Sequence, residues 1–295
     1  MQVMKDMCGR LFPALTLVAI GALLLLLAEG CAVPDHAYVL SGGQGKVAIR
    51  SSGSCGGDGA VFTESAVGID PAGFSIVSWN THKGDDLEWQ RDLVSLGGDA
   101  DIVLLQEAAL GENLQAQLVL MDRDWQLAPA FHSAAGETGV MSISPVRPND
   151  YCALRETEPI IRIPKMALTS TYPLRGTSEL LLVVNVHMVN FTLALDSVRS
   201  QIEDIKETIR AHHGPVVVAG DFNTWSAARL ELVESELAAL DLQPVSFHPD
   251  RRSRFFNRTV DGVYARGLDV VSAHSYPVQS SDHNPLSVHF RVSNG

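Results

Sequence analysis

The sequence contains little of what disulfide-rich or zinc-binding proteins depend on. It has only 4 cysteines in 295 residues and no Cys-x-x-Cys pair, which excludes a disulfide scaffold and a zinc ribbon. It has no internal repeat, which disfavours solenoids and propellers. Charged residues make up 19% and hydrophobic residues 46%, so a sizeable core can form and global disorder is excluded.

Positive charge is also scarce. Lys+Arg number 22 against 34 for Asp+Glu, a formal net charge of -12. This balance argues against a protein that holds long nucleic acid by charge alone, because such binding rests on many Lys/Arg–phosphate contacts. A nuclease is not excluded, since a bound cation supplies positive charge locally. The length suits one large domain or two small ones.

The amino terminus has the order of an export signal. Lys5 and Arg10 precede an uncharged apolar run, Leu11–Ala28, and small residues follow around Cys31. We therefore predict export to a bacterial cell envelope, facing the periplasm or the exterior. Residues 1–31 would be a cleaved signal, a lipoprotein signal or an uncleaved membrane anchor. The segment before Cys31 resembles a lipoprotein cleavage box, from which Glu29 departs, so all three forms stay open.

Residues 32–73 are rich in Gly and Ser, a composition that predicts a flexible tether. Val47, Ile49, Val61 and Phe62 leave an edge strand open as the alternative. This segment also contains Cys55.

The potential disulfide partner of Cys55 is Cys152. The two could pair in an oxidising compartment. Sequence separation says nothing about their geometry. A disulfide and two half-buried thiols therefore both stay open.

Beyond Phe74 short apolar runs alternate with helical stretches. The runs are bounded by Gly, Pro, Asn or Asp, as is typical of buried strands. We expect strands at Phe74–Trp79, Ile102–Gln106, Gly139–Ser144, Lys165–Thr171, Leu180–His187, Val216–Gly220, Val263–Ala265, Leu268–Ala273 and Leu286–Val292. We expect helices at Leu87–Leu96, Leu110–Met121, Leu195–His212 and Ala227–Leu240. The mixture predicts a layered α/β or α+β fold, with sheets inside and helices outside.

Several of these strands lead into a carboxylate, an amide or an imidazole. One such residue is usually a loop cap, but five strand ends in order, with no Lys, form a sharper signal. Oxygen donors of this kind hold Mg²⁺ or Mn²⁺, and imidazoles donate to phosphoryl oxygens. Zinc is disfavoured because no closely spaced His/Cys pair occurs. The residues are Asn80, Glu107, His187, Asp221 with Asn223, and Asp282-His283 before the last strand.

Motifs around these residues carry a resemblance to a known family. They are Ser78-Trp79-Asn80, Leu105-Gln106-Glu107, Asn185-Val186-His187, Gly220-Asp221-Phe222-Asn223 and Ser281-Asp282-His283-Asn284-Pro285. Together they resemble the endonuclease/exonuclease/phosphatase superfamily, and the catalytic domain is expected over residues 74–295. The resemblance implies a deoxyribonuclease-I-like fold, a two-sheet β-sandwich flanked by helices on both outer faces. Trp79–Gly84 and Pro164-Lys165 also resemble a bacterial, envelope-associated subgroup.

The resemblance implies a metal site and a hydrolytic site. Glu107, Asn80 and Asp282 match positions that bind Mg²⁺ or Mn²⁺, and Asn80 is alternatively an amide that orients the phosphate. The other matches are catalytic, with the following roles. Asp221 would position or deprotonate the attacking water, Asn223 would hold Asp221 and the transition state, His187 and His283 would contact phosphoryl oxygens, and Asp261 would orient His283.

Two departures from the family pattern weaken any transfer of DNA-repair specificity. His82 stands where many nucleases of the superfamily carry an acidic residue. The tyrosine that touches phosphate in some relatives has only positional candidates here, Tyr151 and Tyr172.

Other charged groups have weaker signals. His82 and Lys83 either line the substrate phosphate or sit in a solvated loop. Arg155, Glu156, Glu158 and Lys165 are expected to form a surface ion-pair cluster. Three arginines followed by two aromatic residues, at positions 251–256, either contact nucleic acid or anionic lipid or form a solvated loop.

The leading hypothesis is an exported, membrane-tethered phosphoesterase that depends on a divalent metal and acts as a monomer. Its substrate would be a phospholipid headgroup, a small phosphorylated molecule or a nucleic acid. An exported nuclease acting on DNA or RNA is the alternative. A non-catalytic binding protein of the same fold is the third hypothesis, disfavoured because every expected ligand residue is present.

Overall fold

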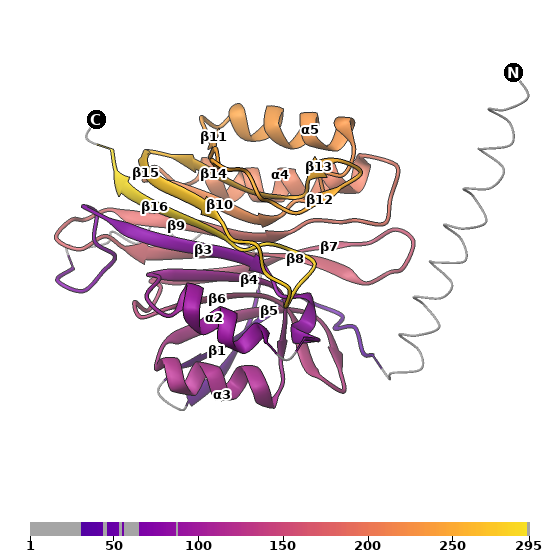
Figure 1. Ribbon diagram of the computed structural model, residues 1–295, viewed down its shortest axis with the longest axis horizontal. Helices are drawn as coiled ribbons and strands as arrows, with labels where there is room; N and C mark the ends of the chain where they lie inside the picture. Colours follow the sequence, from indigo (N-terminus) through magenta and orange to yellow (C-terminus); the bar gives the residue numbers. More distant parts are fainter. Residues whose placement is uncertain (1–30, 44–45, 53–54, 56–64, 87, 294–295) are drawn as a thin grey trace, which may run out of the picture.

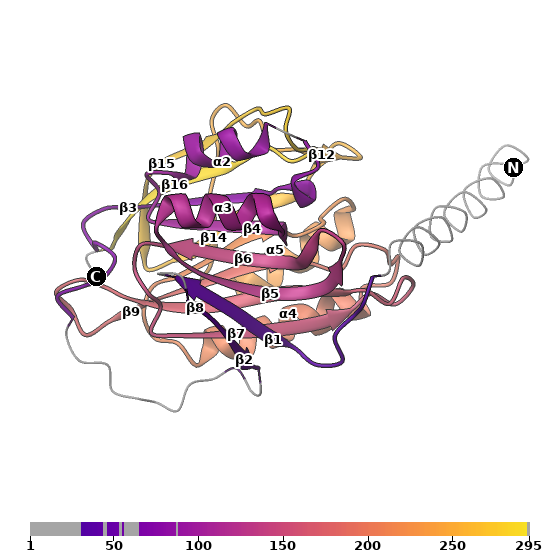
Figure 2. The same cartoon turned by 90° about the horizontal axis from the view of Figure 1, so that it is seen from below.

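A computed structural model of the protein describes residues 31–43, 46–52, 55, 65–86 and 88–293. Two mixed β-sheets pack face to face, and helices cover the outer face of each sheet (Figures 1 and 2). This confirms the predicted two-sheet sandwich with helices on both outer faces. All nine predicted strands and all four predicted helices are present, with ends shifted by a few residues.

The first sheet has eight strands in the order β15-β16-β3-β4-β6-β5-β1-β2. Its central strands β3 and β4 run parallel, and the others pair antiparallel. The strands are β1 (Tyr38–Gly43), β2 (Lys46–Ser51), β3 (Phe74–Asn80), β4 (Ile102–Leu110), β5 (Asp124–Ser133), β6 (Gly136–Ser144), β15 (Leu268–Ser275) and β16 (Leu286–Val292).

The second sheet has six strands in the order β11-β14-β10-β9-β8-β7, with β9 and β10 parallel. A separate two-stranded ribbon, β12 (Arg254–Phe255) with β13 (Arg258–Thr259), extends from it. The six strands are β7 (Asp150–Thr157), β8 (Pro164–Pro173), β9 (Leu180–His187), β10 (Val216–Asp221), β11 (Gln243–Pro244) and β14 (Asp261–Arg266).

Strand alternation builds the core in layers. In β9, Leu181 and Val183 face the space between the sheets, while Leu182 and Val184 face the outer helices. The outer layer is closed by α4 (Asp196–Arg210) and α5 (Ala227–Ala238). The buried face of α4 consists of Val198, Ile202, Ile205 and Ile209, the periodic set that predicts this helix. A turn, η1 (His82–Gly84), follows β3, and the other sheet is covered by α2 (Trp89–Gly97) and α3 (Glu112–Met121).

The prediction of a tether over residues 32–73 is wrong for part of that segment. Strand β1 pairs with β5 and extends the first sheet, and β2 pairs with β1 at its edge. The reason is packing, because Val39 is fully buried between the sheets and outweighs the flexible composition around it. Strand β2 is the edge strand that Val47 and Ile49 leave open, whereas Val61 and Phe62 lie outside the described residues.

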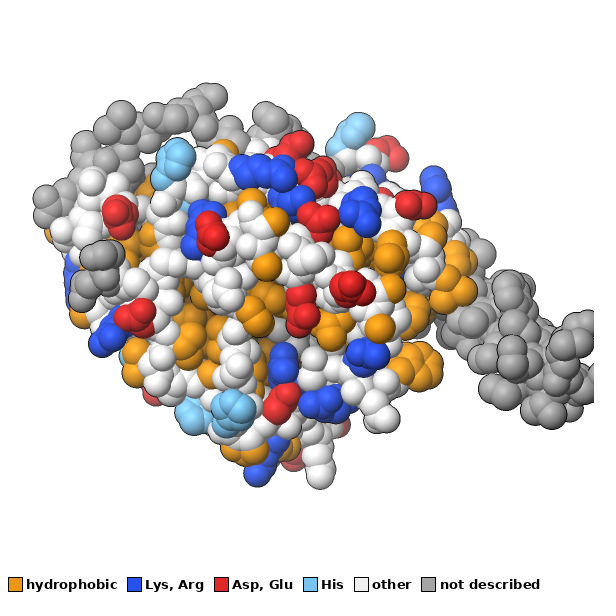
Figure 3. All heavy atoms as spheres, turned by 90° about the horizontal axis from the view of Figure 1, so that it is seen from above, with side chains coloured by type: hydrophobic (Ala, Val, Ile, Leu, Met, Phe, Trp, Pro, Cys, Tyr) orange, Lys and Arg blue, Asp and Glu red, His pale blue; other side chains and the backbone are white. Residues whose placement is uncertain are grey.

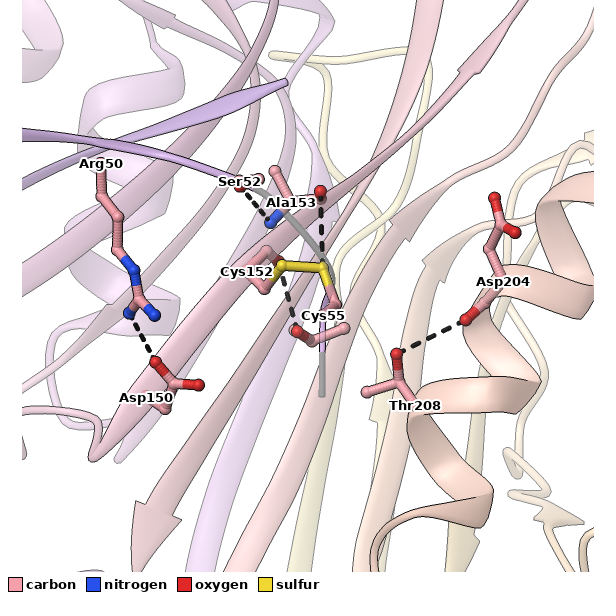
Figure 4. Close-up of a disulfide and its surroundings, with 9 residues drawn as sticks. Arg50, Ser52, Cys55, Asp150, Cys152, Ala153, Asp204 and Thr208 are labelled. Atoms are coloured by element: carbon pink, nitrogen blue, oxygen red, sulfur yellow. Dashed lines mark hydrogen bonds and ion pairs between the residues drawn. A yellow bond between two sulfur atoms is a disulfide. The ribbon is translucent and has the colours of Figure 1, made fainter. Parts of the chain in front are cut away.

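A disulfide joins this amino-terminal addition to the second sheet. Cys55 and Cys152 are bonded, with their Cα atoms 5.6 Å apart. Nearby, the Ser52 hydroxyl accepts a hydrogen bond from the amide of Ala153 at 3.0 Å (Figure 4). The structure therefore settles the pairing that the sequence leaves open.

Two long strands, β5 and β7, have no counterpart in the sequence prediction. Pro129 interrupts β5 at a point where its register with β6 shifts, so the strand has a bulge and no continuous alternating pattern. The predicted export segment lies outside the described residues except for Cys31. Within the part of the chain that the structure describes, no helix is long and apolar enough to span a membrane.

Candidate active site

A cavity of about 470 Å³ opens at one edge of the sandwich and draws its walls from both sheets. Seven of the eight residues assigned to the site from the sequence line it. The eighth, Asp261, lies directly behind His283. The seven are Asn80, Glu107, His187, Asp221, Asn223, Asp282 and His283.

Strand register brings the residues of the second sheet together. Asp221 ends β10, and it stands opposite His187 in the parallel strand β9 and opposite Asp261 in the antiparallel strand β14. Gly220 allows β10 to approach β9 this closely, because it has φ 147° and a Cβ there would lie 2.0 Å from the carbonyl oxygen of Val186. Three neighbouring strands thus deliver two carboxylates and an imidazole to one row.

A β-bulge aims Glu107 into the cavity from the first sheet. The register of β4 with β6 shifts between Leu105 and Ala108, and Glu107 itself has φ 51°. Left-handed backbone costs a non-glycine residue about 1 kcal/mol or more. Bulges and strain of this kind commonly redirect side chains at functional sites.

Asp221 is the most deeply placed acid of the cavity, with a buried side chain. Its Oδ1 accepts the backbone amide of Asn223 at 2.9 Å, and its Oδ2 accepts the Asn80 side-chain amide at 3.1 Å. Burial raises the pKa of the Asp221 carboxyl to about 6, although the neighbouring His283 ring acts in the opposite direction. The carboxylate is therefore held in place by two donors and is a stronger base than an exposed aspartate.

Asn223 couples the β10 loop to the β9 loop. It adopts left-handed backbone with φ 50°, and its side-chain amide donates to the carbonyl of Met188 at 2.9 Å. This single residue therefore fixes the backbone donor to Asp221 and the position of the chain that follows His187.

His283 and Asp261 form a buried pair. The Nδ1 of His283 lies 2.9 Å from both carboxylate oxygens of Asp261, and its Nε2 lies 3.9 Å from Oδ2 of Asp221. Burial alone would lower the pKa of His283, but the carboxylates of Asp261 and Asp221 overcome it and raise this pKa to about 10. The ring is therefore a cation at neutral pH, with Nε2–H directed toward the cavity.

The ring of His187, unlike that of His283, is neutral. Burial, together with the charges of Lys165 and His283, lowers the pKa of His187 well below its usual range. The ammonium of Lys165 lies 2.7 Å from Nε2, and since an ammonium only donates, we assign the ring proton to Nδ1. Gln201 donates to the carbonyl of His187 and thereby holds the end of β9.

Some residues of the cavity wall carry oxygen donors suited to a hard divalent cation. The carboxylates of Glu107 and Asp282 and the side-chain oxygen of Asn80 all line the cavity, and this donor set fits Mg²⁺ or Mn²⁺. A second group, Asp221, Asp261 and His283, offers ligand atoms within 4.8 Å of one another. That group suits a cation less well, because His283 is protonated and already engages both oxygens of Asp261.

A buried polar link ties the two sheets together beneath the cavity. The side chain of Asn185 donates to the carbonyls of Leu105 and Met141 at 3.1 and 2.8 Å, and it accepts from Gln106 at 2.7 Å. These bonds cross from β9 to β4 and β6. They set the distance between the strand ends that carry His187 and Glu107.

The structure corrects one sequence expectation at this site. The predicted surface ion-pair cluster does not form, because Glu158 is fully buried and Lys165 lines the cavity. Glu158 instead accepts the backbone amides of Asn190 and Phe191, which also line the cavity and have no signal in the sequence. These long polar side chains look exposed in sequence, but the turn after β7 buries Glu158, and Lys165 enters the cavity from the start of β8.

Of the remaining candidates for phosphate contact, His82 and Lys83 lie in the cavity and the two tyrosines do not. His82 and Lys83 both line the cavity, with Nδ1 of His82 3.9 Å from Asp282 and Nζ of Lys83 4.0 Å from Glu107. Neither candidate tyrosine does so, since Tyr172 lies in the core and Tyr151 donates to Ser41. Lys165 supplies a polar group to the cavity in their place.

Similarity to known proteins agrees with this geometry. The family model described as "Endonuclease/Exonuclease/phosphatase family" matches residues 77–283. A UPF0294 protein of Yersinia pseudotuberculosis is 39% identical over 216 residues, covering 73% of this chain and 83% of that protein.

Solved structures show the same fold. The catalytic domain of human Nocturnin, with a bound sulfate anion, superposes with a TM-score of 0.59 at 17% identity, covering 77% of this chain and 97% of that one. A mannosyl-6-phosphatase of Bacteroides thetaiotaomicron superposes with a TM-score of 0.56 at 15% identity, covering 74% and 99%. The fold, the constellation of residues and the family match lead to one conclusion: the chain belongs to the endonuclease/exonuclease/phosphatase family of phosphoester hydrolases.

Proposed function

We propose that the protein hydrolyses a phosphodiester or phosphomonoester by in-line attack of a water that Asp221 activates, with Mg²⁺ or Mn²⁺ held by Glu107, Asn80 and Asp282. The observation that carries this proposal is the position of Asp221. It is a buried carboxylate with a pKa raised to about 6, and it lies beside a histidine cation at the wall of an open cavity.

Asp221 fits the role of general base. Its two hydrogen bonds, from Asn80 and from the backbone of Asn223, fix the direction of the carboxylate. A base with a pKa near 6 accepts a proton from water more readily than an ordinary aspartate and is still ionised at pH 7. Asn223 supports this geometry through its bond to Met188.

Two cationic groups face the position where phosphoryl oxygens would lie. His283 is kept protonated by Asp261 and presents Nε2–H, and Lys165 has N–H groups beyond the one directed at His187. Fixed positive groups in a partly buried site stabilise negative charge that develops in a transition state. His187 would act mainly by holding Lys165 in place and by orienting the phosphoryl group.

The metal would supply charge neutralisation at the phosphoryl and leaving oxygens. This chain's own contribution is the set of oxygen donors. Glu107 is directed inward by the β4 bulge, and the Asn80 side chain is fixed because it donates to Asp221 and accepts the amide of His82. Lys83, 4.0 Å from Glu107, is positioned to balance the charge of the acids.

Export and membrane tethering complete the proposal and rest on the sequence of residues 1–31. The substrate would then be a phosphoester outside the cytoplasm, and the protein would act as a monomer. The nuclease alternative rests on the arginines at positions 251–254. Arg252 and Arg254 both pair with Asp250, which partly neutralises them and lowers the charge available for a nucleic acid backbone.

Metal titration of the full-length protein in detergent tests the proposal. Bis-p-nitrophenyl phosphate, p-nitrophenyl phosphate, DNA, RNA and phospholipid would be offered with Mg²⁺, Mn²⁺ or EDTA. We expect turnover that EDTA abolishes and either cation restores. Glu107→Gln should raise the cation concentration needed for half-maximal turnover, whereas Glu112→Gln, an exposed control, should not. Turnover in EDTA at the full rate would refute the metal role.

A further inference from the structure

Exposed apolar side chains lie on loops next to the cavity. Within the described residues three phenylalanines are exposed: Phe191 lines the cavity, and Phe255 and Phe256, 59% and 76% exposed, lie together on the β12–β13 ribbon beside Trp225. Exposed aromatic groups gathered around a site usually mark an interaction surface. We call this set the apolar rim; its members are Ile160, Phe191, Leu193, Phe255 and Phe256.

The rim is continuous with the cavity. Phe191 lines the cavity itself, and Ile160 precedes Ile161, which also lines it. On the other side, the ring of Phe256 lies 6.4 Å from that of Trp225, whose indole donates to the side chain of Asn190 at 2.9 Å.

The β12–β13 ribbon that carries two of the rim residues starts beside the site. Asn284, next to His283, donates to Ser253 and to the carbonyl of Arg251 at the base of the ribbon. Thr224, next to Asn223, donates to the carbonyl of Thr259 on its returning strand. The aromatic tip is therefore held in a fixed relation to the catalytic loops.

Buried charges fix the opposite side of the rim. Glu158 accepts the amides of Asn190 and Phe191, and Arg229 donates to the carbonyls of Val189, Asn190 and Thr192. This loop thus presents Phe191 and Leu193 outward from a rigid base. The side chains of Phe191 and Leu193 are therefore exposed on a well-ordered part of the surface.

The chain enters the fold at this same edge. The backbone of Ala32 pairs with His132 at the end of β5, through bonds of 2.9 and 2.7 Å. The neighbouring residues Ala130, Phe131 and Thr138 line the cavity. The described part of the chain therefore begins on the side where the cavity opens, and the 18-residue apolar run Leu11–Ala28 precedes it in sequence.

Positive charge accompanies the apolar side chains. Arg162 lies two residues after Ile160, and Arg251 precedes the ribbon; both are exposed. Arg254, within the ribbon, is exposed too but pairs with Asp250. Figure 3 shows orange side chains at the right-hand end of the molecule, with blue and red side chains next to them. Aromatic and aliphatic groups bordered by arginines match the interface of an anionic bilayer.

We propose that the apolar rim docks on the lipid bilayer to which the chain's own amino terminus is attached, and that this contact holds the cavity mouth at the headgroup layer. What the cavity does at the membrane rests on the proposed function, but the contact between the rim and the bilayer can be measured separately. The occupant is a lipid surface, because the aromatic tip of the ribbon, the arginines and the start of the described chain all lie at one end of the molecule.

Tryptophan quenching tests the contact directly. Trp79, Trp89 and Trp125 are buried, Trp225 is half-buried under the rim, and the first 30 residues contain no tryptophan. Full-length protein would be placed in vesicles of equal parts phosphatidylethanolamine and phosphatidylglycerol, with or without brominated acyl chains. We expect brominated lipid to quench the fluorescence of the wild type and to leave Trp225→Phe unquenched.

Two double variants make the test specific. F255S/F256S should lose the quenching, whereas V119S/L120S, an apolar pair on α3 that is at least as exposed, should keep it. Each lost phenylalanine should weaken the contact roughly tenfold, given the usual free energy of burying such a side chain. Both variants should retain wild-type turnover of soluble bis-p-nitrophenyl phosphate, because neither replaces a residue of the site.

The outcomes separate the two proposals. Absence of quenching in the wild type, or equal quenching in F255S/F256S, overturns membrane docking and leaves hydrolysis intact if the soluble ester is cleaved. Quenching that depends on the rim, without turnover of any ester, supports docking and overturns the proposed function.

Discussion

Arg229 gives the sharpest stability prediction that the structure allows. Its side chain is only 1% exposed, and its guanidinium donates to four backbone carbonyls. Two bonds are short, 2.7 Å to Val189 and 3.1 Å to Asn223, and two are longer, 3.2 Å to Asn190 and 3.3 Å to Thr192. One buried cation therefore holds both loops that frame the cavity.

Replacement of Arg229 by Met would keep much of the volume and remove every donor. Each short, charge-assisted bond contributes about 1.5–3 kcal/mol, and the carbonyls left behind are buried without partners. The two short bonds together would give about 3–6 kcal/mol, and removal of the buried cation also removes the cost of its burial. The free energy of unfolding should therefore fall by about 3–5 kcal/mol, which is large for one substitution. Because the loops also carry Asn223 and Asn190, turnover should fall as well.

Equilibrium denaturation in urea measures this change. Arg199→Met is the matched control, since Arg199 is exposed and makes a single ion pair, with Glu236 at 3.1 Å. That pair should contribute less than about 1 kcal/mol. If Arg229→Met were as stable as Arg199→Met, the proposed clamp on the two loops would be refuted.

Three further changes should lower stability for different reasons, each measurable by denaturation. Asn185→Leu removes the buried link between the sheets and should cost about 3 kcal/mol, because the carbonyls of Leu105 and Met141 lose their donor. Cys152→Ser opens a loop that spans a sequence separation of 97 residues and should cost about 4 kcal/mol under oxidising conditions. Gly220→Ala places a Cβ 2.0 Å from the carbonyl oxygen of Val186 and should cost more than about 3 kcal/mol.

Matched controls decide whether these three explanations hold. Gly176→Ala also substitutes a glycine with positive φ, but nothing lies within 4 Å, so only about 1 kcal/mol should be lost. Equal losses at the two glycines would contradict the close approach of β10 to β9. A reductant should erase the difference between Cys152→Ser and the wild type. An unchanged urea midpoint for Asn185→Leu would exclude its role as a link.

Much of the site could be predicted because strand ends carry it. His187, Asp221 and Asp261 fall in one row as a direct result of the pairing of β9, β10 and β14. The strands that end in His187 and Asp221 have strong apolar signals, so the polar residue that ends each one is visible in sequence, whereas Asp261 begins β14 and is expected from the family resemblance alone.

What the sequence missed depends on packing between distant segments. Glu158 and Lys165 look like exposed charges, yet one is buried against backbone amides and the other contacts His187. Val39 draws a Gly/Ser-rich segment into the sheet because its apolar cluster combines β5 of the same sheet with β7 and β8 across the core. No local pattern encodes such contacts, since they arise only after the sheets close on each other.

Replacement of Asp221 by Asn tests the central claim most directly. The change keeps the shape of the side chain and removes the base, and kcat/KM for bis-p-nitrophenyl phosphate would be measured with Mg²⁺ on the full-length protein. Asp241→Asn, an exposed substitution, serves as the control. We predict a loss of roughly 10³-fold for Asp221→Asn and none for the control. A variant with the same melting temperature as the wild type and a kcat/KM within tenfold of it would contradict the account.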